Sequence, residues 1–324
     1  MIISMPDTWK HAKDEHKAYL SAIIQNFIDH DIPKAQSPHS KNFVISVRRA
    51  ILSNSRRQME WSIHKLLHHR PILGAANYAL LIKDLKKIFN YSRFRDKPHS
   101  KLPCPPWNAY DLCRKSTLTT CPYCNYNYAH TVFKDKKTGK LRPTLDHFYP
   151  QSLYPHLGLS LANLIPSCYS CNSSLKGDED FFKTQHLHPF FDREAISFAC
   201  AHPTLDLPRV LAEFEKVRDQ LQIKLESATG CIRSKNSIGI FALTERYEKF
   251  TKEAVDFIGG YLALESLVGN LETATAKNPG ERLNLDIPYI KSHVLRFDAQ
   301  YYRGYPLGKM FADLLNQFNR RTKP

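Results

Sequence analysis

The sequence predicts an α+β fold, mostly helical by residue count, with one small metal-braced core. Three observations support this class. Apolar residues recur at helical spacing near both ends of the chain, one stretch alternates as a strand does, and two C-x2-C pairs lie in the middle. The 324 residues allow two or three domains. We expect a basic helical region at residues 1–115, the cysteine-bearing core at 116–190 and a mainly helical region at 191–324.

The first region is predicted to be helical. Apolar residues follow one helix face between Trp9 and Ile28 and again over Arg56–His69, and a further helix fits Ala75–Phe89. Pro71 is expected to end the second of these helices, because proline removes a backbone donor and clashes with the preceding turn. A short helix over residues 107–116 leads into the first cysteine pair.

The last region is predicted to mix strand and helix. The segment DQLQIKLES alternates apolar and polar residues at Leu221, Ile223 and Leu225, as a half-buried strand does. Helical spacing returns over residues 241–272, with a break expected at Gly259-Gly260. A terminal amphipathic helix is expected over residues 306–321.

The net charge is +15 and is distributed unevenly. Residues 1–120 hold 20 Lys and Arg against 9 Asp and Glu, and so carry 11 of the 15 excess positive charges. Such a region attracts phosphate backbones by releasing their counterions. A solvated basic surface that only maintains solubility is the alternative, and charge alone does not separate the two.

No apolar run approaches the roughly 20 residues that a membrane helix needs. The first residues lack the ordered basic, apolar and small-residue segments of a signal peptide. We therefore expect a cytoplasmic protein without membrane contact, whose thiols stay reduced. Eight cysteines in that setting indicate metal ligands or buried thiols before disulfides. Four of them have no partner at a ligand spacing and are expected to be small buried residues: Cys104, Cys113, Cys200 and Cys231.

The other four cysteines form two pairs, Cys121-x-x-Cys124 and Cys168-x-x-Cys171, which are 43 residues apart. Zinc takes four ligands in a tetrahedron, and two intervening residues let both thiolates of a pair turn to one ion. One such pair is a weak signal with which a redox motif competes. Two pairs in turn-rich segments predict a structural Zn²⁺ site. Iron in a tetrathiolate site and unligated thiols are the alternatives.

The segment between the pairs is predicted to be a hairpin whose two arms join at KDKKTGK, residues 134–140. Asp146 and His147 fall near the end of its second arm. Neighbouring residues on an ideal strand point to opposite faces, so the two can share a site only where the strand twists or bulges. Taken alone, an Asp-His pair is more often a surface pair or a packed histidine than a catalytic one. His186 and His188 present the same choice, between a metal site and packing, and packing is favoured.

The string LDHFYPQS…LANLIPSCYSCNSSLKG resembles the HNH endonuclease family, in particular members whose ββα-metal core is braced by four cysteines. The resemblance covers residues 121–177. It rests on Asp146-His147 with a following proline, on Asn163 in the connecting loop, and on Asn172 directly after the last cysteine. The final motif position is Asn172 where many members have His, a variant that the family also uses.

The resemblance implies a role for each of these residues. His147 is the general base, Asn163 orients it, and Asp146 and Asn172 bind a catalytic divalent ion. A neutral imidazole can take a proton from water near pH 7, and hard oxygen ligands suit Mg²⁺ or Mn²⁺. Lys176 follows in the motif, either as a phosphate contact or as a lysine on a helix surface.

The implied activity is metal-dependent hydrolysis of phosphodiester bonds in nucleic acid, DNA more than RNA, leaving 5′-phosphate ends. Further segments, such as HLHPFFD, resemble HNH proteins that are encoded beside ATPases in prokaryotic anti-phage defence systems. That resemblance implies an antiviral effector with an ATPase partner.

Other readings compete with a nuclease. A zinc-stabilised module that binds nucleic acid or a partner would keep the cysteines and the basic region but would not need Asp146, His147 and Asn172. A degenerate HNH subunit would usually have lost the base. A C-x-x-C redox protein would leave the second cysteine pair without a role.

Overall fold

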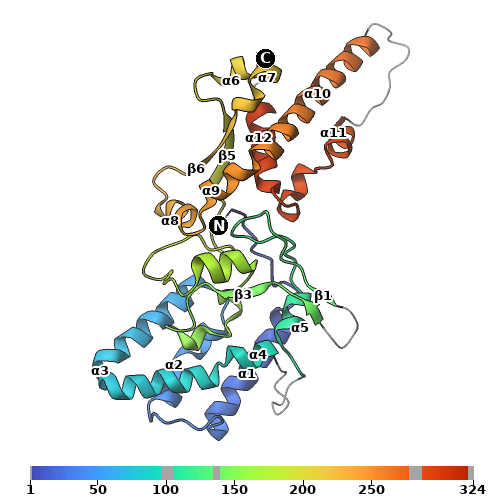
Figure 1. Cartoon of the computed structure of the whole chain (residues 1–324). Helices are drawn as coiled ribbons and strands as arrows, with labels where there is room; N and C mark the ends of the chain where they lie inside the picture. Colours follow the sequence, from blue (N-terminus) through green and yellow to red (C-terminus); the bar gives the residue numbers. More distant parts are fainter. Residues whose placement is uncertain (1, 97–104, 134–138, 277–286, 320–324) are drawn as a thin grey trace. The chain divides into compact units, whose positions relative to one another are not determined.

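The computed structural model describes residues 2–96, 105–133, 139–276 and 287–319 (Figure 1). Over these residues the chain is α+β and mainly helical, with three two-stranded antiparallel sheets, as the sequence predicts for the fold class. The chain divides into two compact units. The N-terminal unit comprises Ser4–Tyr123 and Tyr128–Arg193. The C-terminal unit comprises Met1–Ile3, Cys124–Asn127 and Glu194–Pro324.

Helices make up most of the N-terminal unit (Figure 1). They are α1 Lys13–His30, α2 Ser40–Leu52, α3 Arg56–Ile88, α4 Tyr91–Asp96 and α5 Ala109–Arg114. The helices expected around residues 9–28, 56–69, 75–89 and 107–116 are present, whereas α2 was not predicted. Its segment KNFVISVRR is rich in β-branched residues, which favour strands in isolation. Phe43, Val44 and Val47 nevertheless lie on one buried helix face against α1 and α3.

Helix α3 is two helical segments that meet at Gly74, where φ is 69° and ψ is 166°. The break expected at Pro71 is therefore wrong by three residues, because Pro71 lies inside the helical segment. The backbone at Gly74 has a positive φ that a side chain disfavours and glycine adopts at little cost. Glycine and not proline therefore sets the bend.

The predicted hairpin divides into two separate sheets. Strand β1 (Val132–Phe133) pairs with β2 (Gly139–Leu141), while β3 (Thr144–His147) pairs with β4 (Leu164–Ser167). The expectation that Asp146 and His147 extend the second arm of one hairpin is thus wrong. Pro143 lies between β2 and β3, and its missing N–H interrupts the ladder there. The hairpin tip at residues 134–138 lies outside the described residues.

The connection from β3 to β4 is compact and is hydrogen-bonded to helices α1 and α2. It contains the short helices η1 (Pro155–Leu157) and η2 (Leu161–Asn163). In α1 the imidazole Nε2 of His16 donates to the carbonyl oxygen of Leu159 at 2.7 Å, and the hydroxyl of Ser160 donates to the carbonyl oxygen of Ile51 in α2 at 3.0 Å. The indole of Trp9 donates to Leu164 O at 3.0 Å. These buried hydrogen bonds fix the loop that follows Asp146 and His147.

The C-terminal unit contains the remaining sheet and a second set of helices. Strand β5 (Ile196–Ala201) pairs with β6 (Gln222–Ser227), which confirms the strand expected from the alternating segment. The remaining elements are α6 Leu207–Ala212, α7 Phe214–Val217, η4 Arg218–Gln220, α8 Ile232–Ile240, α9 Leu243–Tyr247, η5 Glu248–Phe250, α10 Thr251–Ala276, α11 Ile287–Leu295, η6 Ala299–Gly304 and α12 Gly308–Asn319. The terminal amphipathic helix is α12, as expected.

Helix α10 continues through Gly259 and Gly260, so the break expected there is wrong. A Cβ at Gly259 would lie 3.2 Å from Cε1 of Phe214, closer than ordinary van der Waals contact. The glycine therefore serves close packing of α10 against α7 and does not end the helix.

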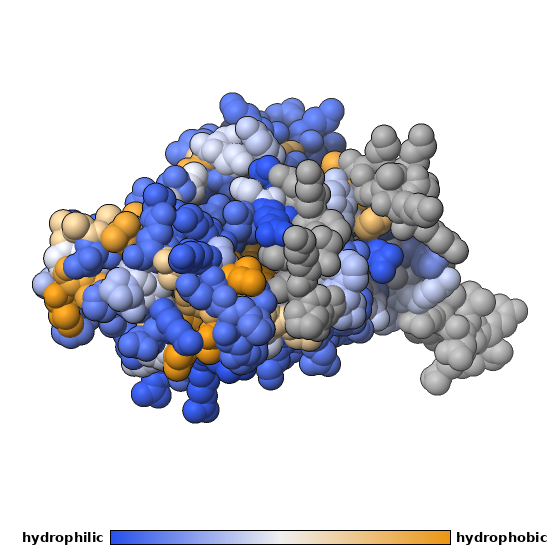
Figure 2. Space-filling model, turned by 90° about the horizontal axis from the view of Figure 1, so that it is seen from below, coloured by the Kyte–Doolittle hydropathy of each residue, from blue (hydrophilic) through white to orange (hydrophobic). Residues whose placement is uncertain are grey.

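The described surface is mostly hydrophilic on the face in Figure 2, where hydrophobic residues appear at separate places. Exposed large apolar side chains of the N-terminal unit include Ile45, Trp61, Leu67 and Ile72. None of the helices in the described ranges combines the length and hydrophobicity needed to cross a membrane.

Candidate functional site

The four paired cysteines converge on one point. The sulfur atoms of Cys121, Cys124, Cys168 and Cys171 all lie within 4.8 Å of one another. Thiolates around a zinc ion at about 2.3 Å lie roughly 3.8 Å apart, so this spacing fits a tetrahedral metal centre. The cluster can therefore hold a metal ion such as zinc, and the predicted convergence of the two pairs is confirmed.

The unpaired cysteines behave differently. Cys113 and Cys200 are buried, and Cys231 is half-buried. Burial raises the pKa of the Cys113 and Cys200 thiols to about 12, so both stay protonated. They are packing residues, as the sequence predicts, while Cys104 lies outside the described residues.

The second cysteine pair lies at a junction between strand and helix. Cys168 comes directly after β4, and Cys171 belongs to η3 (Ser170–Lys176), a seven-residue π-helical segment. Asn172 follows Cys171 in the same segment. Strand β3 contacts η3, so the second cysteine pair and the Asp-His pair are placed by the same three short elements.

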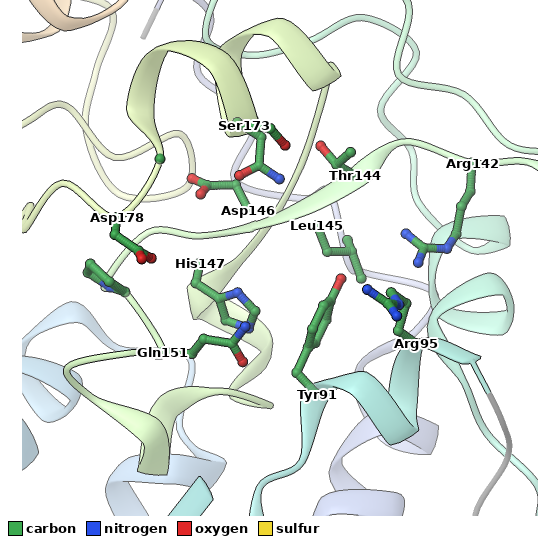
Figure 3. Close-up of a pocket in the computed structure, with 13 residues that line it drawn as sticks. Tyr91, Arg95, Arg142, Thr144, Leu145, Asp146, His147, Gln151, Ser173 and Asp178 are labelled. Carbon is green, nitrogen blue, oxygen red and sulfur yellow. The ribbon is translucent and has the colours of Figure 1, made fainter.

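A cavity of about 410 Å³ opens beside these elements (Figure 3). Asp146 and His147 from β3 and Asn172 from η3 line it together. The pairing of β3 with β4 continues without a bulge through both residues. They nevertheless both line one cavity, and His147 is the last residue of β3. Three of the four predicted site residues are thus brought together.

The imidazole of His147 is oriented by the backbone. Its Nε2 lies 2.9 Å from the carbonyl oxygen of Gly158, which only accepts, so Nε2 carries the proton. Burial lowers the pKa of His147 to about 4, and the ring is neutral at pH 7 with its lone pair on Nδ1. The ring of Tyr91 packs edge-on against the imidazole, with centroids 4.5 Å apart. The ring is therefore held in one orientation and is uncharged, so Nδ1 can accept a proton.

Asn163 lies outside the cavity and is fully buried. Its Oδ1 accepts from the amide of Tyr149 at 2.8 Å, and its Nδ2 donates to the carbonyl oxygens of Tyr149 and Leu157 at 3.0 and 3.1 Å. Leu157 precedes Gly158, whose carbonyl holds His147. Asn163 therefore reaches His147 through the loop backbone and makes no direct side-chain contact with it.

Asp146 is buried and already has two partners. Tyr123, between the first two cysteines, donates its hydroxyl to Oδ2 at 2.5 Å, and the ammonium of Lys176 lies 3.0 Å from Oδ1. Lys176 also donates to the carbonyl oxygen of His147 at 2.8 Å. Both readings of Lys176 as a surface lysine or a phosphate contact are wrong, because its side chain is 1% exposed and neutralises Asp146.

The side chains of Asp146 and Asn172 provide some of the ligands that a divalent ion needs. Each carboxylate oxygen of Asp146 has two lone pairs and uses one in the contacts above, and the carboxylate lines the cavity. Asn172 lines the same cavity, and its side-chain amide contains a second oxygen donor. Hard oxygen donors of this kind suit Mg²⁺ or Mn²⁺, while the nearby ammonium opposes a cation.

Four further residues of the cavity were missed in the sequence: Tyr91, Arg95, Arg142 and Asp178. Asp178 follows directly after the motif, which ends at Gly177, and could have been found there. Tyr91 and Arg95 come from α4, far away in the sequence, and no local pattern marks them. Arg142 belongs to the basic segment before Pro143, whose pattern predicts only a hairpin arm.

His186 and His188 pack into the core, as the sequence favours. His186 stacks on the ring of Phe181 with centroids 3.8 Å apart, and His188 contacts Phe148 at 4.2 Å. His188 Nε2 donates to Ala162 O, and its Nδ1 accepts from the amide of Phe190. Both nitrogens of His188 are therefore occupied, which leaves none for a metal.

Comparison with known proteins finds a partial sequence similarity to a phage protein. No family model matches the chain, and no solved structure matches it. A stretch of 112 residues is 29% identical to protein ea31 of Escherichia phage lambda. This stretch makes up 34% of this chain and 32% of that protein. The chain thus spans about a third of the length of this relative. The similarity assigns neither a family nor an activity.

Proposed function

We propose that this chain is a metal-dependent HNH-type endonuclease that hydrolyses phosphodiester bonds in nucleic acid, with DNA as the favoured substrate. In this proposal β3, β4 and η3 are the ββα core, and the cysteine cluster with its zinc ion is the brace. The observation that supports it best is the common cavity of Asp146, His147 and Asn172 beside that cluster.

The proposed role of His147 is to accept a proton from the attacking water. The hydrogen bond from Nε2 to Gly158 O leaves Nδ1 as the basic atom, and the neutral ring is the form that can act. Tyr91 limits rotation of the ring from one side. Asn163 holds the loop that carries Gly158, so it is a positioning residue in this mechanism.

Asp146 and Asn172 would hold the divalent ion. A bound Mg²⁺ or Mn²⁺ would supply charge neutralisation at the phosphate and stabilise the leaving oxygen. Tyr123 and Lys176 keep the Asp146 carboxylate in one orientation through their hydrogen bond and ion pair. The excess positive charge of residues 1–120 would attract the nucleic-acid backbone.

A second candidate function is favoured by one specific contact. The ion pair with Lys176 satisfies Asp146 without any metal ion, as a purely structural aspartate would require. A zinc-stabilised module that binds nucleic acid or a protein partner, without hydrolysis, fits this contact. A binding module of this kind, however, gives no reason for His147 to be held with a free lone pair beside the cavity.

A plasmid-nicking assay with and without Mg²⁺ or Mn²⁺ separates the two functions. The nuclease should nick supercoiled DNA only with the divalent ion. His147→Ala should remain folded, keep its zinc and bind DNA, but cleave more slowly by roughly 10²–10⁴, the usual contribution of a general base. Cleavage by His147→Ala at the wild-type rate would reject the nuclease and leave the binding module.

The proposal extends to an ATPase partner and a role in anti-phage defence, which rest on the sequence resemblance alone. Co-purification of the tagged chain from its host with the neighbouring genes intact tests this part. A fully active chain recovered without any partner would reject it.

A further inference from the structure

The cavity has two electrically different sides. Asp146 and Asp178 line it as carboxylates, while Arg95 and Arg142 line it as guanidinium groups. Figure 3 shows Arg95 and Arg142 on the side opposite Asp178, with Tyr91 between them and His147. The arginines come from α4 and from the segment between β2 and β3, so two separate parts of the N-terminal unit place positive charge here.

Arg142 is held in place but is not neutralised. Its Nη1 donates to the carbonyl oxygen of Pro143 at 2.9 Å, and its guanidinium lies over the ring of Tyr110 at 5.3 Å. No carboxylate in the described part of the chain pairs with it, and its buried Nε has no hydrogen-bond partner there. Its other contacts in the described part of the chain are with the hydroxyl of Tyr91 and the thiol of Cys113, so its N–H donors meet no negative charge there.

The neighbouring groups do not neutralise it either. Burial raises the pKa of Tyr91 to about 12, and the nearby Arg142 acts in the opposite direction, so Tyr91 stays an uncharged phenol at neutral pH. Burial likewise raises the pKa of Cys113 to about 12, which keeps this thiol protonated beside Arg142. The positive charge of Arg142 therefore faces the cavity uncompensated.

We propose that Arg142, assisted by Arg95, binds a backbone phosphate of the substrate in this cavity, opposite Asp146 and His147. The planar guanidinium fork matches two phosphate oxygens, and such charge-assisted contacts are stronger than neutral ones. This inference rests on the proposed function for the identity of the anion. It assigns the two arginines to substrate binding and not to the chemical step.

The test is DNA binding without cleavage. The parent protein is the full chain with His147→Ala, and the probe is a fluorescein-labelled DNA duplex without added divalent ions, measured by anisotropy over a series of salt concentrations. Arg142→Gln and Arg95→Gln are each added to this parent. Arg114→Gln is the matched control, because Arg114 is an exposed arginine of α5 in the same unit and lies outside the cavity. Arg142→Lys keeps the charge and loses the fork.

Arg142→Gln should weaken binding by about 10- to 100-fold, the range for a lost hydrogen bond to a charged group. It should also make the slope of log affinity against log salt shallower by about 0.9, the value for one phosphate contact. Arg142→Lys should keep the slope and lose part of the affinity, Arg95→Gln should show a smaller loss, and Arg114→Gln should match the parent. Melting curves show whether each variant is folded.

A folded Arg142→Gln variant with the affinity and slope of Arg114→Gln would overturn the inference, as would a parent that does not bind the duplex. The proposed function fails separately, through the nicking assay of the wild-type chain. If the wild-type chain nicks DNA while the Arg142→Gln variant binds it normally, the proposed function stands and the arginine site is rejected.

Discussion

The ammonium nitrogen of Lys176 lies 3.0 Å from Oδ1 of Asp146, and the two side chains are 1% and 2% exposed. A buried ion pair adds little net stability, but removing one partner leaves an uncompensated buried charge. Lys176 belongs to η3, which follows β4, whereas Asp146 belongs to β3. This pair joins η3 to β3 and occupies one side of the carboxylate that is proposed to bind a divalent ion.

Lys176→Met should therefore make the stability of the protein depend on divalent ions. Without the ammonium, the Asp146 carboxylate is buried and unpaired, which should lower the free energy of unfolding by about 3–5 kcal/mol. A divalent ion can replace the lost positive charge, so Mn²⁺ should restore part of the loss. Urea unfolding of the wild type and of Lys176→Met, with and without Mn²⁺, measures this.

The double variant Asp146→Asn/Lys176→Met is the control. It has no carboxylate to neutralise, so its free energy of unfolding should not respond to Mn²⁺. An equal response in the double and single variants would mean that the ion binds elsewhere. No response in Lys176→Met would remove Asp146 from the proposed metal ligands.

Cys168→Ser should remove the metal ion from the cysteine cluster and destabilise the fold, because the binding energy of a structural zinc ion is part of the folding energy. We expect lower zinc content by metal analysis and a poor yield of folded protein. Cys231→Ser is the matched control, since Cys231 is half-buried and lies outside the cluster. It should keep the wild-type zinc content. Equal zinc in both variants would show that Cys168 is not a ligand.

The N-terminal unit should lose stability as the pH falls below about 6.5, in part through His156. This residue of η1 is fully buried, its Nε2 is hydrogen-bonded to the hydroxyl of Ser62 at 3.0 Å, and burial lowers its pKa to about 3. Between that value and the unfolded pKa near 6.5, the unfolded chain binds a proton that the folded chain does not. Stability is therefore complete above about pH 6.5 and falls towards pH 3.

At pH 5 the loss from His156 should be about 2 kcal/mol relative to pH 7.5. Replacing it with asparagine should lower stability at pH 7.5 but flatten the decline with pH. The exposed His11 provides the control, and His11→Asn should leave the profile unchanged. Unfolding curves from pH 7.5 to 5 check this, and a decline of full size in His156→Asn would assign it to other groups.

The parts of the site that could be predicted are those encoded over short distances. Cysteines at C-x2-C spacing can turn to one ion whatever the rest of the fold does, and the convergence of Cys121 and Cys124 with Cys168 and Cys171 followed from that rule. Asp146 and His147 are adjacent, and Asn172 follows a cysteine directly, so the same cluster draws them towards one cavity.

The parts that could not be predicted depend on contacts between distant elements. Arg142 and Tyr91 meet at the cavity only because α4 packs near β3, and neither lies in a pattern that marks a site. The same holds for Gly259, where the ring of Phe214 and not a helix break explains the glycine. Lys176 has the spacing of an exposed helix residue, but the charge of Asp146 draws it inside.

Tyr123 connects the first cysteine pair to the cavity, and Tyr123→Phe should show what this connection contributes. Burial raises the pKa of Tyr123 well above its usual value, so the hydroxyl stays protonated and donates to Oδ2 of Asp146 at 2.5 Å. Its loss should lower the free energy of unfolding by about 1.5–3 kcal/mol, the range for a hydrogen bond to a charged group. The zinc content should not change, because all four cysteines remain.

If the hydroxyl also orients Asp146 for a divalent ion, Tyr123→Phe should need more Mn²⁺ for half-maximal nicking than the wild type. Tyr128→Phe is the control, since Tyr128 follows five residues later and is 61% exposed. Its stability, zinc content and Mn²⁺ requirement should match the wild type. A Tyr123→Phe variant that is less stable but has the wild-type Mn²⁺ requirement would make the tyrosine a brace of the core alone. A Tyr123→Phe variant that matches Tyr128→Phe in stability and in Mn²⁺ requirement would show that the cysteine cluster does not act on Asp146 through this side chain.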